Sequence, residues 1–345
     1  MSQQAPGRAR KIAFTLLGLA VSALFAWLTL RKVSVAELGQ HMLAASLPIL
    51  LLSLVTKLVG MLFMTLRSTV VLAGVGHFRF MQLFRSIFIV TGGNAILPLR
   101  LGEILRIGFL VRTGGASAGA CLGAVALERL LDMFCLVALF AVVMPMTMLD
   151  LPAESSLYAF ALVLTVGMGG SLWAARRPEQ VVVVAGRLAG LAGPVAASRI
   201  QGLVGRLTQG LSSLRSTRGV ILVMLYTLGY WMASVGSAAV WLWAFDLQLP
   251  WYAPFLVLFF AAMGSFLPSS PSAVGTYHFF TTQALLLLGV GRALATSVVV
   301  LGHALAFFPV ALVSLPWLVI EVIALLDTRR AERHSSGPPS SSRPE

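Results

Sequence analysis

Charged residues are scarce in this sequence. They make up 11% of its 345 residues, whereas soluble globular proteins carry about 25%. Hydrophobic residues account for 58%, and the mean hydropathy is +0.90. This scarcity excludes a soluble globular protein, and the long apolar runs predict an all-α polytopic membrane protein.

Cysteine is also nearly absent, and so are catalytic motifs. Cys121 and Cys135 lie in one apolar run without metal-ligand spacing, so neither a disulfide framework nor a zinc site is expected. The sequence has no Walker glycine loop, no His-Glu-x-x-His pair and no Gly-x-Ser-x-Gly elbow. We therefore expect no metal, no cofactor and no catalytic residue, and the pattern favours a transporter over an ATPase, protease or hydrolase.

Acidic residues are few, 12 against 25 basic residues, and the formal net charge is +13. The basic residues follow the ends of apolar runs or lie in residues 176–218, as topology signals and lipid-headgroup contacts do. Aromatic residues are absent from 176–218, so nucleic-acid binding is the weaker interpretation.

Six apolar runs are long enough to cross a bilayer, which takes about 20 residues. They cover residues 12–30, 46–66, 118–149, 158–175, 219–245 and 294–326. Lys57 lies near the middle of the second run, where a charge is costly, so it should face the protein interior. We assign the following basic loop, which begins at Arg67, to the cytoplasm.

Two further apolar regions, 87–111 and 253–288, are interrupted by Gly, Pro and polar residues. The breaks are Gly92–Arg106, with the sequence GGNAILPLRLGEILR, and Gly264–His278. Interrupted backbone at membrane depth persists only where protein covers it or where it lines a watery cavity. We predict two re-entrant or broken helical hairpins, the first opening to the cytoplasm and the second to the outside, arranged as an inverted repeat with the site between them. Two full crossings within 253–288 fit the charge pattern equally well.

The charge pattern also divides the chain. Residues 1–11 are expected to form a basic cytoplasmic tail, 12–327 an integral membrane domain, and 328–345 a disordered cytoplasmic tail. Within the membrane domain, 176–218 carries seven arginines and one acid, and its apolar stripe predicts an amphipathic helix on the inner leaflet. Both termini are expected in the cytoplasm.

The first break supplies the leading candidates for substrate binding. Arg100 and Arg106 have guanidinium groups that match phosphate oxygens, although both would also serve as interfacial anchors. Glu103, three residues from each, neutralises them or binds a cationic headgroup. Asn94 binds a headgroup or satisfies the broken backbone.

The run 118–149 contains Glu128, Arg129 and Asp132, which helical spacing places within reach of one another. Three uncompensated charges would cost roughly 8–10 kcal/mol, so they must be paired, wet or near the interface. An internal ion network and a role in substrate or proton coupling both fit, and Lys57 is expected to complete or gate the network.

In the second break the candidates for substrate binding are Pro268, Pro271, Gly275 and His278. The main role expected of the two prolines and the glycine is to set the backbone conformation. His278 has a side chain that titrates near neutral pH, as does His303 in the last run. For both histidines a structural role is the alternative.

Three motifs resemble, in order and spacing, the lysylphosphatidylglycerol synthase transmembrane-region family, also called flippase-like. They are Asn94–Arg106, Glu128–Asp132 and Pro268–Gly275. The third departs from the family's Pro-Gly-Gly-x-Gly form, because Ser272 and Ala273 stand in place of its two glycines and His278 follows in place of an acidic residue. The resemblance implies lipid handling in the bacterial inner membrane. Members with a soluble synthase domain flip aminoacylated phosphatidylglycerol, and stand-alone relatives are associated with hopanoid, glycolipid or phospholipid transport.

We therefore expect a stand-alone flippase or transporter that moves a phospholipid, glycolipid or related polar lipid between leaflets. An intramembrane transferase with Glu103 or Glu128 as general base is the alternative. A membrane scaffold that recruits a lipid-synthesis enzyme through residues 176–218 is another. The expected partners are membrane lipids with anionic headgroups, not nucleic acid. The sequence is compatible with a homo-oligomer and does not determine the oligomeric state.

Overall fold

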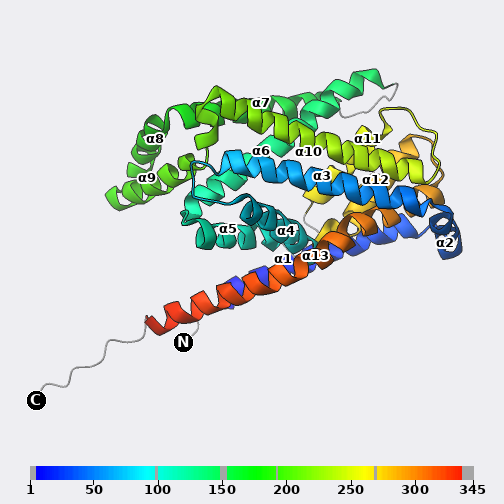
Figure 1. Ribbon diagram of the computed structural model, residues 1–345, viewed down its shortest axis with the longest axis horizontal. Helices are drawn as coiled ribbons and strands as arrows, with labels where there is room; N and C mark the ends of the chain where they lie inside the picture. Colours follow the sequence, from blue (N-terminus) through cyan, green and yellow to red (C-terminus); the bar gives the residue numbers. More distant parts are fainter. Residues whose placement is uncertain (1–4, 98–99, 148–153, 192, 268–269, 336–345) are drawn as a thin grey trace, which may run out of the picture.

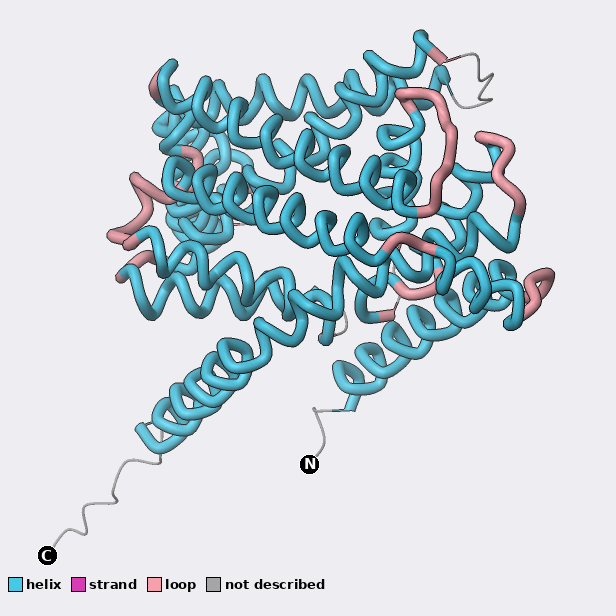
Figure 2. The backbone as a smooth tube through the Cα atoms, turned by 45° about the vertical axis from the view of Figure 1, so that its right-hand side comes forward, coloured by secondary structure: helices cyan, strands magenta, loops and turns pink. Residues whose placement is uncertain are grey.

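The computed structural model describes residues 5–97, 100–147, 154–191, 193–267 and 270–335, and every regular element within them is a helix. Figure 2 shows the helices lying side by side, with most loops at their ends. The α-helices are α1 (Ala5–Leu30), α2 (Val35–Ala44), α3 (Leu47–Val71), α4 (Phe80–Ile96), α5 (Leu101–Gly114), α6 (Ala118–Val143), α7 (Glu154–Arg176), α8 (Pro178–Gly190), α9 (Pro194–Gln209), α10 (Thr217–Ala244), α11 (Ala253–Phe266), α12 (Thr276–Leu287) and α13 (Arg292–Ser335). Short 3₁₀ helices are η2 (Met144–Met146), η3 (Ser212–Arg215) and η4 (Pro271–Ala273).

Local chemistry explains where the long helices begin. Ser117 caps α6 by accepting a hydrogen bond from the Ala120 amide at 3.1 Å, and Ser216 caps α10 through the Gly219 amide at 3.0 Å. Pro48 lies in the first turn of α3, where its missing N–H removes no helical hydrogen bond. The apolar sequence that follows each start then carries the helix into the core.

Three helices of the described chain are long and apolar enough to cross a membrane: α3, α10 and residues 292–327 of α13. A fourth results if α1 and α2, bent by 80° at their junction, form one span. Helix α6 has 26 residues but carries Glu128, Arg129 and Asp132. The prediction of an all-α polytopic membrane protein is confirmed, whereas the total of six full spans stays a prediction.

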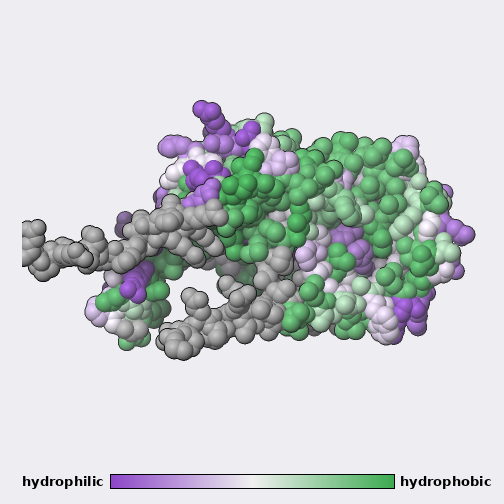
Figure 3. Space-filling view, turned by 90° about the horizontal axis from the view of Figure 1, so that it is seen from below, coloured by the Kyte–Doolittle hydropathy of each residue, from purple (hydrophilic) through white to green (hydrophobic). Residues whose placement is uncertain are grey.

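The surface agrees with a membrane protein. In Figure 3 hydrophobic residues cover most of the middle of the visible face, and hydrophilic residues gather toward its two ends. Large apolar side chains are exposed along the long helices, for example Leu51, Leu225 and Leu312. An apolar belt of this extent is unstable in water and is stable against lipid.

Helices α3 and α10 pack against each other through much of their length and form the centre of the bundle (Figure 1). Gly60 of α3 allows Tyr230 to approach, and Gly229 of α10 allows Phe63 to approach. The α8–α9 pair lies at one end of the molecule and α2 at the other (Figure 1). The bundle therefore has two distinct polar ends.

Both predicted breaks interrupt helices. Helices α4 and α5 pack together as one hairpin, and α11 and α12 as another. Their limbs have 17, 14, 14 and 12 residues, and each is shorter than the roughly 20 residues of a full span. The short limbs favour broken hairpins over two full crossings within residues 253–288.

A glycine closes each hairpin at its tip. A Cβ atom built on Gly102 would lie 2.5 Å from the Val90 carbonyl oxygen and 2.7 Å from the Asn94 amide nitrogen. A Cβ atom on Gly264 would lie 2.7 Å from the Thr276 carbonyl oxygen. Both hairpins therefore require backbone-to-backbone contact that only glycine permits.

Three boundaries differ from the prediction. Arg67 is not in a cytoplasmic loop but in α3, because the apolar run continues to Val71. Residues 328–335 are helical, so the disordered tail does not begin at 328. The single amphipathic helix expected within 176–218 is instead the α8–α9 pair followed by η3, and α9 packs against α6.

We expect Gly102→Ala to destabilise the first hairpin by about 1–3 kcal/mol, since the added methyl group meets backbone that has no alternative rotamer. The measurement is the Tm of the detergent-solubilised protein. Gly169→Ala in α7 is the matched control, because a Cβ atom there meets nothing within 4 Å. Equal Tm values for the two variants would contradict backbone contact at the tip.

Candidate functional site

A buried ion pair lies at the centre of the first hairpin's packing against α3 and α6. Arg106 and Glu128 form it, and their side chains are 0% and 1% exposed. Ser68 donates a hydrogen bond to Glu128 Oε1 at 2.7 Å, and Arg106 Nη2 lies 2.9 Å from Ser68 Oγ. Arg106 Nε reaches Ser86 Oγ at 3.4 Å. All three guanidinium nitrogens therefore have partners within the protein.

A second pair extends this arrangement toward α10. Arg67 Nη1 lies 2.5 Å from Asp132 Oδ1 and 3.5 Å from Thr227 Oγ1. Arg129 Nη1 lies 3.3 Å from Asp132 Oδ2, and Arg129 Nε lies 3.4 Å from Glu103 Oε1. The predicted pairing of Arg129 with Asp132 is thus present, and it continues to Glu103 of the first hairpin.

Together these side chains form what we call the intramembrane ion network: Arg67, Glu103, Arg106, Glu128, Arg129 and Asp132. Three formal positive charges balance three negative ones, so the network is neutral as a whole. Pairing offsets the large cost of transferring each charge from water into a low-dielectric interior. Of the three alternatives for Glu128, Arg129 and Asp132, namely paired, wet or near the interface, the structure shows pairing.

Two residues are placed differently from the prediction. Arg106 was expected to hold a phosphate, but it is fully buried and bonded within the network, so its guanidinium has no free face. Lys57 was expected to complete the network, and within the described residues it forms no ion pair. Its Nζ lies 5.7 Å from the ring of Phe307 on α13.

The tips of the two hairpins meet. Arg100 Nη2 donates a hydrogen bond to the Ser265 carbonyl oxygen at 2.5 Å, and Ser272 Oγ donates to the Ala95 carbonyl oxygen at 2.8 Å. Ala95 lies in the last turn of α4 and Ser265 in the last turn of α11, where helix carbonyls lack intrahelical partners. Each break therefore satisfies a carbonyl group of the other.

Arg100 is the exposed cation of this hairpin junction. Its backbone is left-handed, with φ of 53°, and its guanidinium lies 5.6 Å from the ring of Phe266. Within the described residues it forms no ion pair with a carboxylate. Unlike Arg106, it has a charged group available to an anion.

Two acceptor atoms near the junction are buried without a hydrogen bond in the described structure. They are Asn94 Oδ1 and Glu103 Oε2. Buried polar atoms in proteins are nearly always satisfied. These two oxygens match hydroxyl or ammonium donors of a ligand, which keeps Asn94 and Glu103 as candidates for headgroup contact.

The second break is covered by α1 and positions a histidine pair. Gly275 has a φ of 94° and packs against the Ser22 backbone, while Pro271 begins η4 and Pro268 lies outside the described residues. His278 Nδ1 accepts a hydrogen bond from the Gly275 amide at 3.2 Å. Its Nε2 lies 3.2 Å from Nδ1 of His303 on α13. The two predicted histidines are therefore in contact.

A further ion pair, outside the network, was also not expected from the sequence. Glu321 on α13 is buried and pairs with Arg112 at the end of α5. Glu321 is the single acid within the apolar run 294–326, and an isolated acid in such a run indicates a buried partner. The first hairpin is thus joined to α13 as well as to α6.

Glu128→Gln should leave Arg106 buried without its counter-charge and lower the free energy of unfolding by about 3–5 kcal/mol. The double variant Arg106→Met/Glu128→Leu should recover most of that loss, since it removes both charges. Denaturant unfolding in detergent measures both effects.

Glu37→Gln is the matched control, because Glu37 lies exposed in the first turn of α2. A loss for Glu128→Gln no larger than that for Glu37→Gln would mean that the network does not stabilise the fold.

Comparison with known proteins gives one match. The family model described as the lysylphosphatidylglycerol synthase TM region matches residues 15–314. No curated protein and no solved structure matches the chain. The matched range contains both hairpins and the whole ion network, and the chain belongs to the lysylphosphatidylglycerol synthase TM region family.

Proposed function

We propose that this protein moves a polar lipid between the leaflets of the bacterial inner membrane, with the headgroup passing the hairpin junction while the acyl chains stay in lipid. The observation that carries the proposal is the contact between two broken hairpins beside the exposed guanidinium of Arg100. A guanidinium binds phosphate oxygens through two parallel hydrogen bonds. The ligand it favours is a phospholipid, or a glycolipid with a phosphate.

The arrangement of the tips supports a position at membrane depth. Limbs of 12–17 residues span about 18–26 Å at 1.5 Å per residue, less than the roughly 30 Å hydrocarbon core. Discontinuous helices that meet in this way are the usual substrate site of transporters built from inverted repeats. The reciprocal carbonyl contacts of Ala95 and Ser265 are what an inverted pair of hairpins would produce.

The proposed orientation rests on charge. The α8–α9 pair and the loop between α3 and α4 lie at the same end of the molecule (Figure 1). The α8–α9 pair carries three arginines and one acid, and residues 72–79 carry Arg79 and no acid. Basic loops stay in the cytoplasm, so the first hairpin opens to the cytoplasm and the second to the outside. Both termini then lie in the cytoplasm.

A transferase is the second candidate, and the geometry narrows it to Glu103. Glu128 is 1% exposed, and both of its oxygens accept hydrogen bonds, from Arg106 and Ser68, so a substrate cannot reach it to give up a proton. Glu103 Oε2 is free of such bonds within the described residues. A transferase would leave a modified lipid, whereas a flippase changes only its leaflet.

Arg100→Gln should reduce lipid flipping at least about tenfold, because it removes the charged donor for phosphate at the junction. The assay uses proteoliposomes with fluorescent phosphatidylglycerol, and an impermeant quencher reports the exposed leaflet. Mass spectrometry of the same lipids shows whether any was modified.

Arg31→Gln serves as the control, since Arg31 is an exposed arginine that lies 4.8 Å from the ring of Trp27 and comes nine residues after Ser22, the α1 residue that contacts the second break. The proposal is wrong if the reconstituted protein moves no lipid across a panel of headgroups. Full flipping by Arg100→Gln would remove Arg100 from the mechanism.

A further inference from the structure

A cavity of about 620 Å³ lies at the open end of the first hairpin, between the end of α3, the start of α4 and the end of α5. Its size is within the 300–1,000 Å³ typical of small-molecule sites. Leu83, the lining residue furthest along α4, is 13 residues before Ile96 at the hairpin tip, or about 20 Å away. The cavity is therefore a different place from the hairpin junction.

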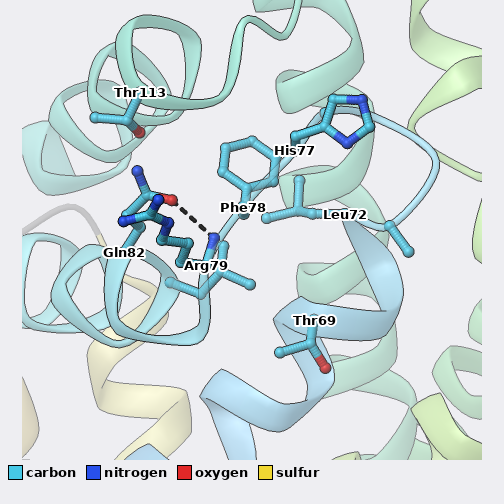
Figure 4. A pocket seen from close by; sticks show the side chains of 10 residues that line it. Thr69, Leu72, His77, Phe78, Arg79, Gln82 and Thr113 are labelled. Carbon is cyan, nitrogen blue, oxygen red and sulfur yellow. Dashed lines mark hydrogen bonds between the residues drawn. The ribbon is translucent and has the colours of Figure 1, made fainter.

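The ionisable side chains that line this cavity are Arg79 and His77, and no carboxylate lines it. Figure 4 shows Arg79 beside Gln82 at the start of α4, with Phe78 between them and His77. Within the described residues the Arg79 guanidinium has no ion pair. A cavity with basic and no acidic lining attracts anions.

The side-chain amide of Gln82 is a second hydrogen-bond donor beside Arg79, and its orientation is fixed. Gln82 Oε1 accepts a hydrogen bond from the Arg79 amide at 2.7 Å, which leaves the Gln82 Nε2 group free to donate. Phe78 forms a rigid wall because its ring packs where a Cβ atom of Gly114 would lie. The guanidinium and the amide donor thus share one preformed polar corner.

The cavity also lies close to the ion network. Leu72, the C-cap residue of α3, lines it and lies one helical turn after Ser68, which bonds Glu128. Gln82 lies one helical turn before Ser86, which bonds Arg106. A ligand held here rests on the same faces of α3 and α4 that hold the buried pair.

We propose that this cavity is a second binding site, which takes a phosphate group through Arg79 and Gln82. The phosphate belongs either to a lipid headgroup or to a soluble compound, and the chemistry that recognises it is the same. The site exists independently of any lipid movement at the hairpin junction.

The test is a titration of the full chain in neutral detergent with fluorescent phosphatidylglycerol, read by anisotropy. It is run in an Arg100→Gln background, so that the junction does not contribute. Arg79→Gln should weaken binding at least about tenfold. Thr113→Leu, which fills the cavity and removes no charge, should weaken it as well.

Arg85→Gln is the matched control, because Arg85 is an exposed arginine of α4 that stacks on Trp317 at 4.5 Å and does not line the cavity. It should change the affinity less than about twofold.

A competition experiment identifies the source of the phosphate. Displacement of the fluorescent lipid by inorganic phosphate would assign a soluble ligand, and failure of phosphate to displace the lipid would assign a lipid headgroup. Either result supports the site. Equal effects of Arg79→Gln and Arg85→Gln, or equal binding of a fluorescent diacylglycerol without phosphate, would overturn it.

Discussion

The structure depends on the pairing of charges inside an apolar bundle. An unpaired arginine or carboxylate costs several kcal/mol at membrane depth. The ion network of this chain contains three arginines and three carboxylates, all of them paired. Arg106 with Glu128 joins α5 to α6, and Arg67 with Asp132 joins α3 to α6. Because these pairs join different helices, separating α3, α5 and α6 would leave their charges unpaired. The network therefore fixes the limb of a hairpin that is too short to span the membrane alone.

The two breaks depend on each other in a similar way. A helix that ends at membrane depth leaves carbonyl oxygens without partners, and water is not available there to replace them. Ser272 satisfies Ala95 and Arg100 satisfies Ser265, so each hairpin completes the other. Glycines at 102 and 264 allow the limbs of each hairpin to approach closely enough for the tips to meet.

The sequence predicted the helical class, both breaks and a costly charge cluster at Glu128, Arg129 and Asp132, since composition and local spacing determine these features. It did not predict the partners, because these come from helices distant in the chain. Arg67 was assigned to a loop since a basic residue near the end of an apolar run resembles a topology signal. For the same reason the same two candidate roles, phosphate contact and interfacial anchor, were predicted for Arg100 and Arg106. Only the packing of α6 and α11 separates the buried arginine from the exposed one.

The burial of Arg106 and the exposure of Arg100 limit the path that the proposed function leaves to a headgroup. Arg106 and Glu128 are sealed between α3, α5 and α6, so a polar ligand cannot pass through the network between the cavity at the open end of the first hairpin and the hairpin junction. The alternative route follows the outer face of the first hairpin, where Ile96 and Ile104 are exposed and Arg100 lies between them in the chain. A lipid suits such a route better than a free solute, because its acyl chains stay against those apolar side chains while its headgroup reaches Arg100. In the proposed function, the sealed network serves as the fixed wall along which the lipid moves.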